Sequence, residues 1–220
     1  MAAPKITLYV DILSPFAYIA YYVLRHSPVF EKCTKVYVPV FLGGIIQATG
    51  NIPPIRVKNK DKWINVERMR WSKLLNVPIT ETTPEGFPVN TLAVQRALCV
   101  IAEDHLEKLV GCIDAFYHAL WVKSDSTVGM PEGYVPVLER VIGKDAAIKV
   151  AEKASTAEIK KKLVSNTDQS LESGAFGLPW IECTNAQGKT ESFWGVDHLG
   201  QVAAFLDLNV TQDKGFKALL

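Results

Sequence analysis

The first forty residues constrain the fold of this chain more than any other stretch. Two β-type runs, residues 6–10 and 35–41, flank a segment from Pro15 to about residue 30 whose apolar side chains have helical spacing. A helix that connects two paired strands of one sheet in this way requires those strands to be parallel. The beginning of the chain is therefore predicted to be a βαβ unit.

A short corner joins the first strand to the helix, and its last two residues have a clear local preference. Serine is a good helix N-cap, and proline is favoured at the first helical position, so Ser14 and Pro15 predict the start of the helix. Ser14 is thus placed at the positive end of a helix and at the carboxyl end of a strand, a position that favours an anion. The alternative interpretation is that Ser14 is an N-cap and nothing more.

The rest of the chain predicts a long helical block and then a return to strands. Helical patterns follow one another from about residue 63 to Gly174. Two β-type runs, 179–184 and 190–194, then flank a turn as in a hairpin, and a last helix follows with Asp197 as its predicted N-cap.

This order of elements is typical of a thioredoxin-type sheet that is interrupted by helices. We expect an α/β, thioredoxin-like fold with a large all-helical insertion. Residues 1–62 would form the N-terminal βαβ part, residues 63–174 the helical insertion, and residues 175–220 the C-terminal ββα part.

Charge and hydropathy exclude several classes of partner. The chain has 24 basic and 23 acidic residues, a balance that does not favour nucleic acid or a membrane surface. Its apolar runs are too short to span a bilayer. The first strand begins a few residues after Met1, so we expect no targeting peptide and a cytoplasmic location. Cysteines 33, 99, 112 and 183 lack redox or metal-ligand spacing, which predicts four reduced thiols and no metal.

The residues at the start of the first helix decide what chemistry is available. Where thioredoxin-like folds carry Cys-x-x-Cys, this chain has Ser14, Pro15, Phe16 and Ala17. Disulfide exchange is excluded there because it needs an attacking thiolate. A ligand must then bring the sulfur, and glutathione is the obvious candidate. Its thiol has a pKa of about 8.5, and a hydroxyl at a helix N-terminus would favour the ionised form.

Four sequence blocks resemble the kappa-class glutathione transferases and the related bacterial 2-hydroxychromene-2-carboxylate isomerases. They read DILSPF at 11–16, GNIPP at 50–54, GAFGLP at 174–179 and WGVDH at 194–198, in the family's order and over nearly the whole chain. The resemblance implies a DsbA-like thioredoxin fold, a homodimer and glutathione as co-substrate without a metal. Because family members also occur in mitochondria and peroxisomes, those compartments are alternatives.

The resemblance also implies a role for individual residues. Ser14 would stabilise the glutathione thiolate, the backbone of Leu178 beside a cis Pro179 would pair with the glutathione backbone, and Asp197 would hold its α-amino group. Further binding residues would be Asn51, Lys60, Val196 and His198, with Lys58 and Lys62 as alternatives to Lys60. The family usually has Ser or Asn at the position of Val196 and Arg at the position of His198, so the contacts of these two stay open.

The implied function is transfer of glutathione to a small apolar electrophile, with Ser14 acting by electrostatic stabilisation. Candidates for an apolar wall that receives the electrophile are Phe16, Tyr18, Trp63, Trp71 and Trp194. A first alternative is a glutathione-dependent cis–trans isomerase of the 2-hydroxychromene-2-carboxylate type. A second is a non-catalytic thioredoxin-like module that binds glutathione or acts as a chaperone.

Overall fold

The structure, a computed structural model, describes residues 2–213 and 216 and contains one mixed sheet. Its strands are β1 (Lys5–Val10), β2 (Thr34–Pro39), β3 (Trp180–Thr184) and β4 (Thr190–Trp194), in the order β2-β1-β3-β4. β2 is parallel to β1, whereas β3 is antiparallel to both β1 and β4. The predicted βαβ unit and the predicted hairpin are therefore confirmed, and the β1–β3 pairing joins them into one sheet.

The helices follow the predicted sequence of elements with shifted ends, except that the sequence analysis did not predict the helix over residues 42–49. The helix that was expected to reach residue 30 ends at His26, because Ser27 caps a separate 3₁₀ turn that begins at Pro28. The helices are α1 (Pro15–His26), α2 (Leu42–Thr49), α3 (Lys60–Leu74), α4 (Leu92–Asp104), α5 (Leu106–Tyr117), α6 (Pro131–Ile142), α7 (Lys144–Ala154), α8 (Ala157–Glu172) and α9 (Leu199–Phe205).

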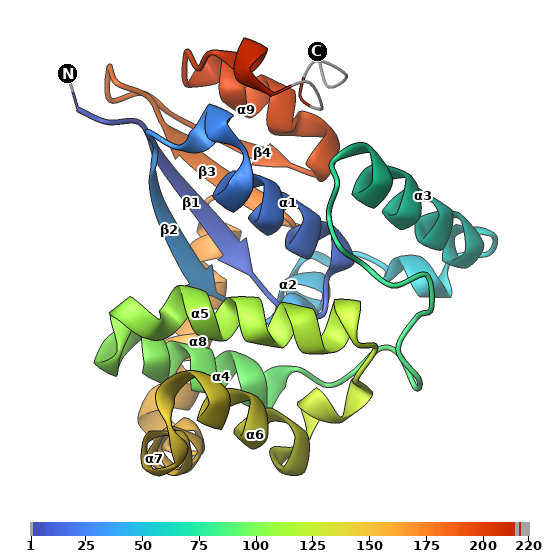
Figure 1. Ribbon diagram of the computed structural model, residues 1–220, viewed down its shortest axis with the longest axis vertical. Coiled ribbons are helices and arrows are strands. Elements are labelled where there is room, and N and C mark those ends of the chain that lie inside the picture. The colour runs from blue at the N-terminus through green and yellow to red at the C-terminus, as the bar shows by residue number, and fades with distance from the viewer. Residues whose placement is uncertain (1, 214–215, 217–220) are drawn as a thin grey trace.

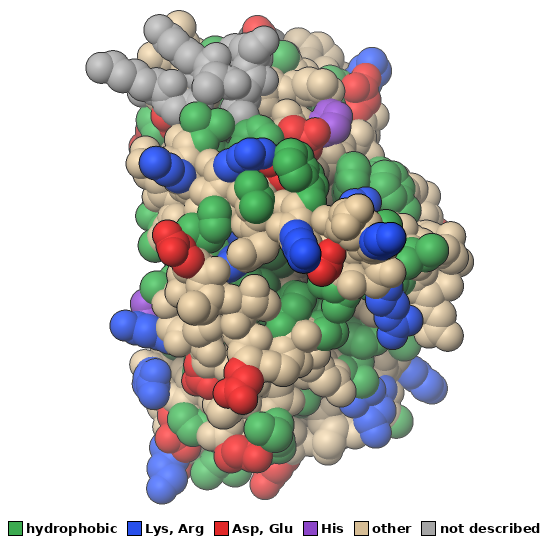
Figure 2. Space-filling model, turned by 90° about the vertical axis from the view of Figure 1, so that its right-hand side faces the viewer, with side chains coloured by type: hydrophobic (Ala, Val, Ile, Leu, Met, Phe, Trp, Pro, Cys, Tyr) green, Lys and Arg blue, Asp and Glu red, His purple; other side chains and the backbone are tan. Residues whose placement is uncertain are grey.

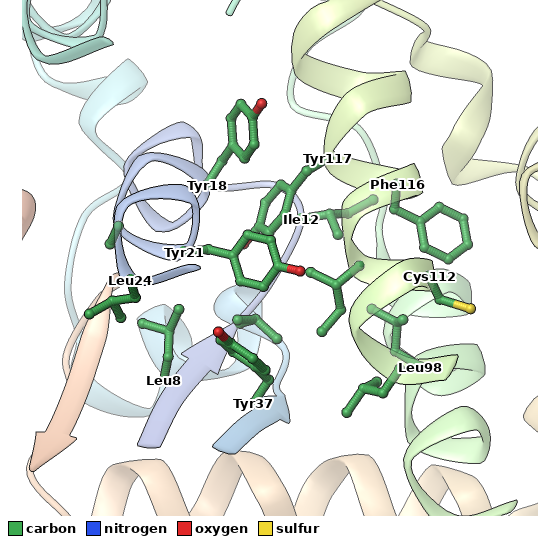
Figure 3. Close-up of a cluster of buried hydrophobic side chains, with 14 of the residues drawn as sticks. Leu8, Ile12, Tyr18, Tyr21, Leu24, Tyr37, Leu98, Cys112, Phe116 and Tyr117 are labelled. Carbon is green, nitrogen blue, oxygen red and sulfur yellow. The ribbon is translucent and has the colours of Figure 1, made fainter. Parts of the chain in front are cut away.

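The helical block packs against the sheet domain through α1 and also directly against β2 and α2. In Figure 1, α1 lies in front of the sheet, α3 lies to one side, and α4 to α7 form a layer below. One hydrophobic core contains side chains of β1, α1, α4 and α5. Figure 3 shows Tyr21 of α1 and Tyr117 of α5 meeting at this junction, and their ring centroids are 5.3 Å apart. The insertion therefore shares its core with the element that carries Ser14.

A second, smaller cluster lies under the other face of the sheet. Tyr9 and Trp180 are paired across β1 and β3 and pack there with Ile45 of α2 and Leu178. This cluster fixes the segment that enters β3 against the end of β1, which is where the site residues gather.

No helix in the described residues is long and apolar enough to cross a membrane. The last residues of the predicted ββα part, 214–215 and 217–220, lie outside the described residues.

Candidate active site

Ser14 caps α1, as its sequence context predicts. It has extended backbone angles, and its Oγ accepts a hydrogen bond of 3.1 Å from the backbone N–H of Ala17. Pro15 occupies the first helical position. Because Oγ accepts the Ala17 hydrogen bond, the hydroxyl proton is left for another acceptor. Ser14 is only 6% exposed, so any acceptor that reaches it is largely shielded from water.

A fully buried carboxylate, that of Asp11, holds the corner before Ser14. Oδ1 accepts hydrogen bonds from the Leu13 N–H at 3.0 Å, the Thr91 hydroxyl at 2.8 Å and the Gln95 amide at 3.2 Å. Oδ2 accepts from the Leu42 N–H, at the start of α2, at 2.9 Å.

These four donors act against the cost of burying the carboxylate. Burial raises the pKa of Asp11, while hydrogen bonds to the ionised form lower it. The sequence interpretation gave Asp11 no role beyond the end of the strand. A carboxylate directly after a mostly apolar strand was the available signal, because such a position is desolvated when the strand is central.

The segment before β3 lies beside the end of β1. Trp180 pairs with Tyr9, which places Pro179 opposite Val10, and the Leu178–Pro179 peptide is cis, as expected. Within the described residues, the backbone N–H and C=O of Leu178 take part in no backbone hydrogen bond. A peptide-like ligand therefore finds an unpaired amide group next to the corner that carries Ser14.

Asn51 connects the loop after α2 to the segment before β3. Its amide nitrogen donates to the Phe176 carbonyl at 2.8 Å, and its Oδ1 accepts from the N–H of Ile52 at 2.8 Å. The second and third sequence blocks are thus joined directly. This bond gives Asn51 a structural role, and its direct contact with a ligand stays a prediction.

The fourth block forms a 3₁₀ turn, Val196–His198, that contacts α1. The prediction that Asp197 caps the last helix is wrong, because this turn delays α9 and places His198 at the cap position without a side-chain cap bond. The Asp197 side chain is 60% exposed, with His198 Nδ1 3.4 Å from its Oδ1. The carboxylate is thus available to a ligand. The Val196 side chain is apolar and buried, so only the backbone of this residue can make a polar contact.

Lys60 is the first residue of α3 and is exposed. Its side chain makes no hydrogen bond or ion pair with any other described residue. Lys58 and Lys62 are exposed as well, so the geometry does not choose among the three. In Figure 1, α3 lies beside α1, and the two helices are in contact.

Only some of the expected aromatic residues are available to an apolar ligand. Trp63 and Trp194 are exposed, whereas Tyr18 is buried and donates its hydroxyl to the Pro78 carbonyl. Phe176, which the sequence interpretation missed, is exposed and packs against Trp194 with ring centroids 4.9 Å apart. Figure 2 shows hydrophobic side chains interspersed with Lys and Arg on the side of the molecule where α3 lies.

The four cysteines are unpaired and buried, and burial raises the pKa of each, to about 11 for Cys112 and about 12 for Cys99 and Cys183. Within the described residues, no three His, Cys, Asp or Glu side chains are grouped to hold a metal.

Because the four thiols are buried and have raised pKa values, we expect a disulfide reagent to leave all of them unmodified in the folded protein at neutral pH. After unfolding, the reagent should titrate four thiols. Rapid modification of one thiol without unfolding would contradict this.

Residues 5–207 match the family model described as DSBA-like thioredoxin domain. Glutathione S-transferase kappa 1 of Caenorhabditis elegans is 27% identical over 209 residues, which are 92% of this chain and 91% of the relative. The Rattus norvegicus protein of the same name is 27% identical over 212 residues, 93% of this chain and 92% of the relative.

Solved structures agree with this match. A 2-hydroxychromene-2-carboxylate isomerase structure covers 92% of this chain and 94% of its own, with TM-score 0.76 and 20% identity. The structure of the cytosolic disulfide reductase DsbM of Pseudomonas aeruginosa, solved with GSH, covers 92% of this chain and 97% of its own, with TM-score 0.63 and 13% identity. The predicted DsbA-like thioredoxin fold with a helical insertion is confirmed.

Proposed function

Because this chain belongs to the DSBA-like thioredoxin domain family, we propose that it is a glutathione transferase of the kappa type. The observation that carries the proposal is the Ser14 hydroxyl, whose oxygen accepts the Ala17 N–H at a helix N-terminus and whose proton is free. Relatives named glutathione S-transferase kappa, which align over more than nine-tenths of the chain, support it.

In the proposed reaction, Ser14 donates its hydroxyl proton in a hydrogen bond to the sulfur of bound glutathione. The positive end of α1 adds a favourable field for the same anion. A free thiol with a pKa of about 8.5 is only a few per cent ionised at pH 7, so lowering this pKa increases the nucleophile concentration directly. The thiol proton is released to water, and the thiolate attacks the electrophile with its own electron pair, which forms the new carbon–sulfur bond. In an aryl chloride the carbon–chlorine bond then breaks, and chloride leaves with its electron pair.

The proposed binding mode uses the backbone and side chains around Ser14. The free amide of Leu178, beside Pro179, would pair with the peptide backbone of glutathione. The exposed Asp197 carboxylate would bind the α-amino group of glutathione. The backbone N–H of Val196 would bind the carboxylate of the γ-glutamyl residue. Lys60 would supply a positive charge at the other end of the ligand. His198 Nδ1 is a buried atom that makes no hydrogen bond and lies 3.4 Å from Asp197 Oδ1, so His198 would act on the ligand through Asp197.

The remaining partners are also part of the proposal. The exposed aromatic residues Trp63, Trp194 and Phe176 favour a small apolar electrophile as the second substrate.

We propose a homodimer in the cytoplasm. Size-exclusion chromatography with light scattering would test the oligomeric state, and fractionation of the source cells would test the location. We keep the division at residues 62/63 and 174/175 as a proposed description of the two units.

The central test is a titration of the purified protein with glutathione. We expect saturable heat in calorimetry, a thiol pKa well below 8.5 from ultraviolet thiolate absorbance, and conjugation of a nitro-activated aryl chloride. Thioredoxin-type dithiol activity with insulin should be absent, because Ser14 replaces the attacking cysteine. Absence of glutathione binding would refute the proposal, and binding without turnover of any electrophile would favour the non-catalytic module.

One observation favours a second candidate function. The fold match to the 2-hydroxychromene-2-carboxylate isomerase covers nearly all of both chains. The same thiolate would add to the substrate, permit rotation about a bond, and leave again. Parallel assays with that substrate and with the aryl chloride would distinguish isomerase from transferase.

Asp197→Asn is expected to weaken glutathione binding about tenfold, which corresponds to about 1.4 kcal/mol, through loss of a charge-assisted contact with the α-amino group. Calorimetry measures this. Because Asp197 does not cap α9, thermal stability should change little. Asp145→Asn, an exposed carboxylate on α7, is the matched control and should leave affinity unchanged. Equal affinity of both variants would remove Asp197 from the binding site.

A further inference from the structure

The corner that carries Ser14 is held from the helical insertion as well as from the sheet. Trp121 Nε1 donates a hydrogen bond of 2.8 Å to the Ile12 carbonyl, and both residues are almost completely buried. Tyr117 Oη donates to the Asp11 carbonyl at 3.4 Å. Figure 3 shows Tyr117, from the end of α5, beside Ile12. Two residues that lie more than a hundred positions later in the sequence thus donate hydrogen bonds to two consecutive carbonyl groups of the corner.

Trp121 lies in an unusual helical turn. Residues His118–Val122 continue α5 as a π-helix, in which the Lys123 N–H donates to the His118 carbonyl. π-turns are rare and frequently occur at functional sites, since the inserted residue changes the direction of the following side chains. Here the turn directs the indole N–H toward the Ile12 carbonyl.

The indole is fixed from its other side too. The buried Arg68 guanidinium lies 5.3 Å from the ring centroid of Trp121 and donates hydrogen bonds to the carbonyls of Thr80 and Glu81. The Thr80 N–H in turn donates to the Trp121 carbonyl at 2.8 Å. A cation over an aromatic ring and this backbone bond leave Trp121 little freedom to reorient.

We infer that Trp121 is a positioning residue for Ser14, an inference that rests on the proposed function. Only three residues separate the last residue of β1 from Ser14, and the Ser14 N–H closes the corner on the Asp11 carbonyl at 3.2 Å. The Trp121 bond fixes the peptide plane inside that closed corner. Without it, the buried Ile12 carbonyl lacks a partner and the corner reorganises to find one, which displaces the hydroxyl from the sulfur.

Trp121→Phe tests this inference, because it removes the N–H donor while keeping an aromatic ring under Arg68. We expect kcat for conjugation to fall about tenfold, the thiol pKa of bound glutathione to rise, and KM for glutathione to change little. Amide exchange of Ser14 and Ala17, followed by NMR, should accelerate. Tyr117→Phe, which removes the longer bond without changing volume, should shift the same readouts in the same direction by less.

Tyr21→Phe is the matched control. It removes the hydrogen bonds from Tyr21 of α1 to the Val110 carbonyl and the Asp114 carboxylate of α5, and it touches no residue of the corner. It should lose some stability and leave the thiol pKa and both amide exchange rates unchanged.

The inference is overturned if both corner variants match Tyr21→Phe in thiol pKa and in exchange at Ser14 and Ala17. Failure of the unsubstituted protein to ionise glutathione overturns the proposed function instead. The exchange rates still report whether Trp121 positions the corner in that case.

Discussion

Ser14→Ala is expected to reduce kcat/KM for conjugation about 10²-fold. Loss of one preorganised hydrogen-bond donor to an anion in an active site typically has an effect of this size. The thiol pKa of bound glutathione should rise by about one unit, because the ionised sulfur loses its hydroxyl hydrogen bond and keeps only the field of α1. Pre-steady-state conjugation at several pH values, combined with thiolate absorbance, measures both effects.

The same substitution also removes the N-cap of α1, so stability needs its own control. Loss of the Ala17 hydrogen bond should cost about 1 kcal/mol. Thr156→Ala removes an equivalent cap at α8, where Thr156 Oγ1 accepts from the Ile159 N–H, far from the corner in sequence. It should lose similar stability and keep full activity. If Ser14→Ala keeps the kinetics of the unsubstituted protein, Ser14 is a cap alone.

Asp11→Ala is expected to give the largest loss of stability, on the order of 3–5 kcal/mol, because two backbone N–H groups and two polar side chains would lose their buried acceptor. For a chain of this length this corresponds to a fall in melting temperature of roughly 6–20 °C. Denaturant unfolding and calorimetry measure it. Glutathione binding should weaken too, because Asp11 ties α2 to the corner before Ser14.

Asp104→Ala separates this effect from loss of an ordinary carboxylate. Asp104 pairs with Lys153 at 2.8 Å near the surface, and such pairs contribute at most about 1 kcal/mol. A loss of stability in Asp11→Ala no greater than that in Asp104→Ala would show that the buried network contributes little.

Local sequence patterns predicted the elements well because each depends on near neighbours. The Ser14–Pro15 pair sets the start of α1, and the capping hydrogen bond joins residues only three positions apart in the sequence. Alternation and turn residues located the β3–β4 hairpin. Asp197 shows where this reasoning fails. An acidic residue before an apolar helix is a typical cap, but here Gly195, at a positive φ of 95°, is followed first by a 3₁₀ turn.

The sequence by itself determined the order of the strands and of the helices other than α2, the cap at Ser14, the missing thiols and, through four short blocks, the family resemblance. All of these depend on residue type and on spacing within a few turns. Only the tertiary structure decided that Asp11 has four donors, that Trp121 reaches Ile12 and that Asn51 joins the Phe176 loop. Those bonds join residues far apart in sequence, and they arise because desolvated polar groups in a packed interior must find partners wherever the fold brings them.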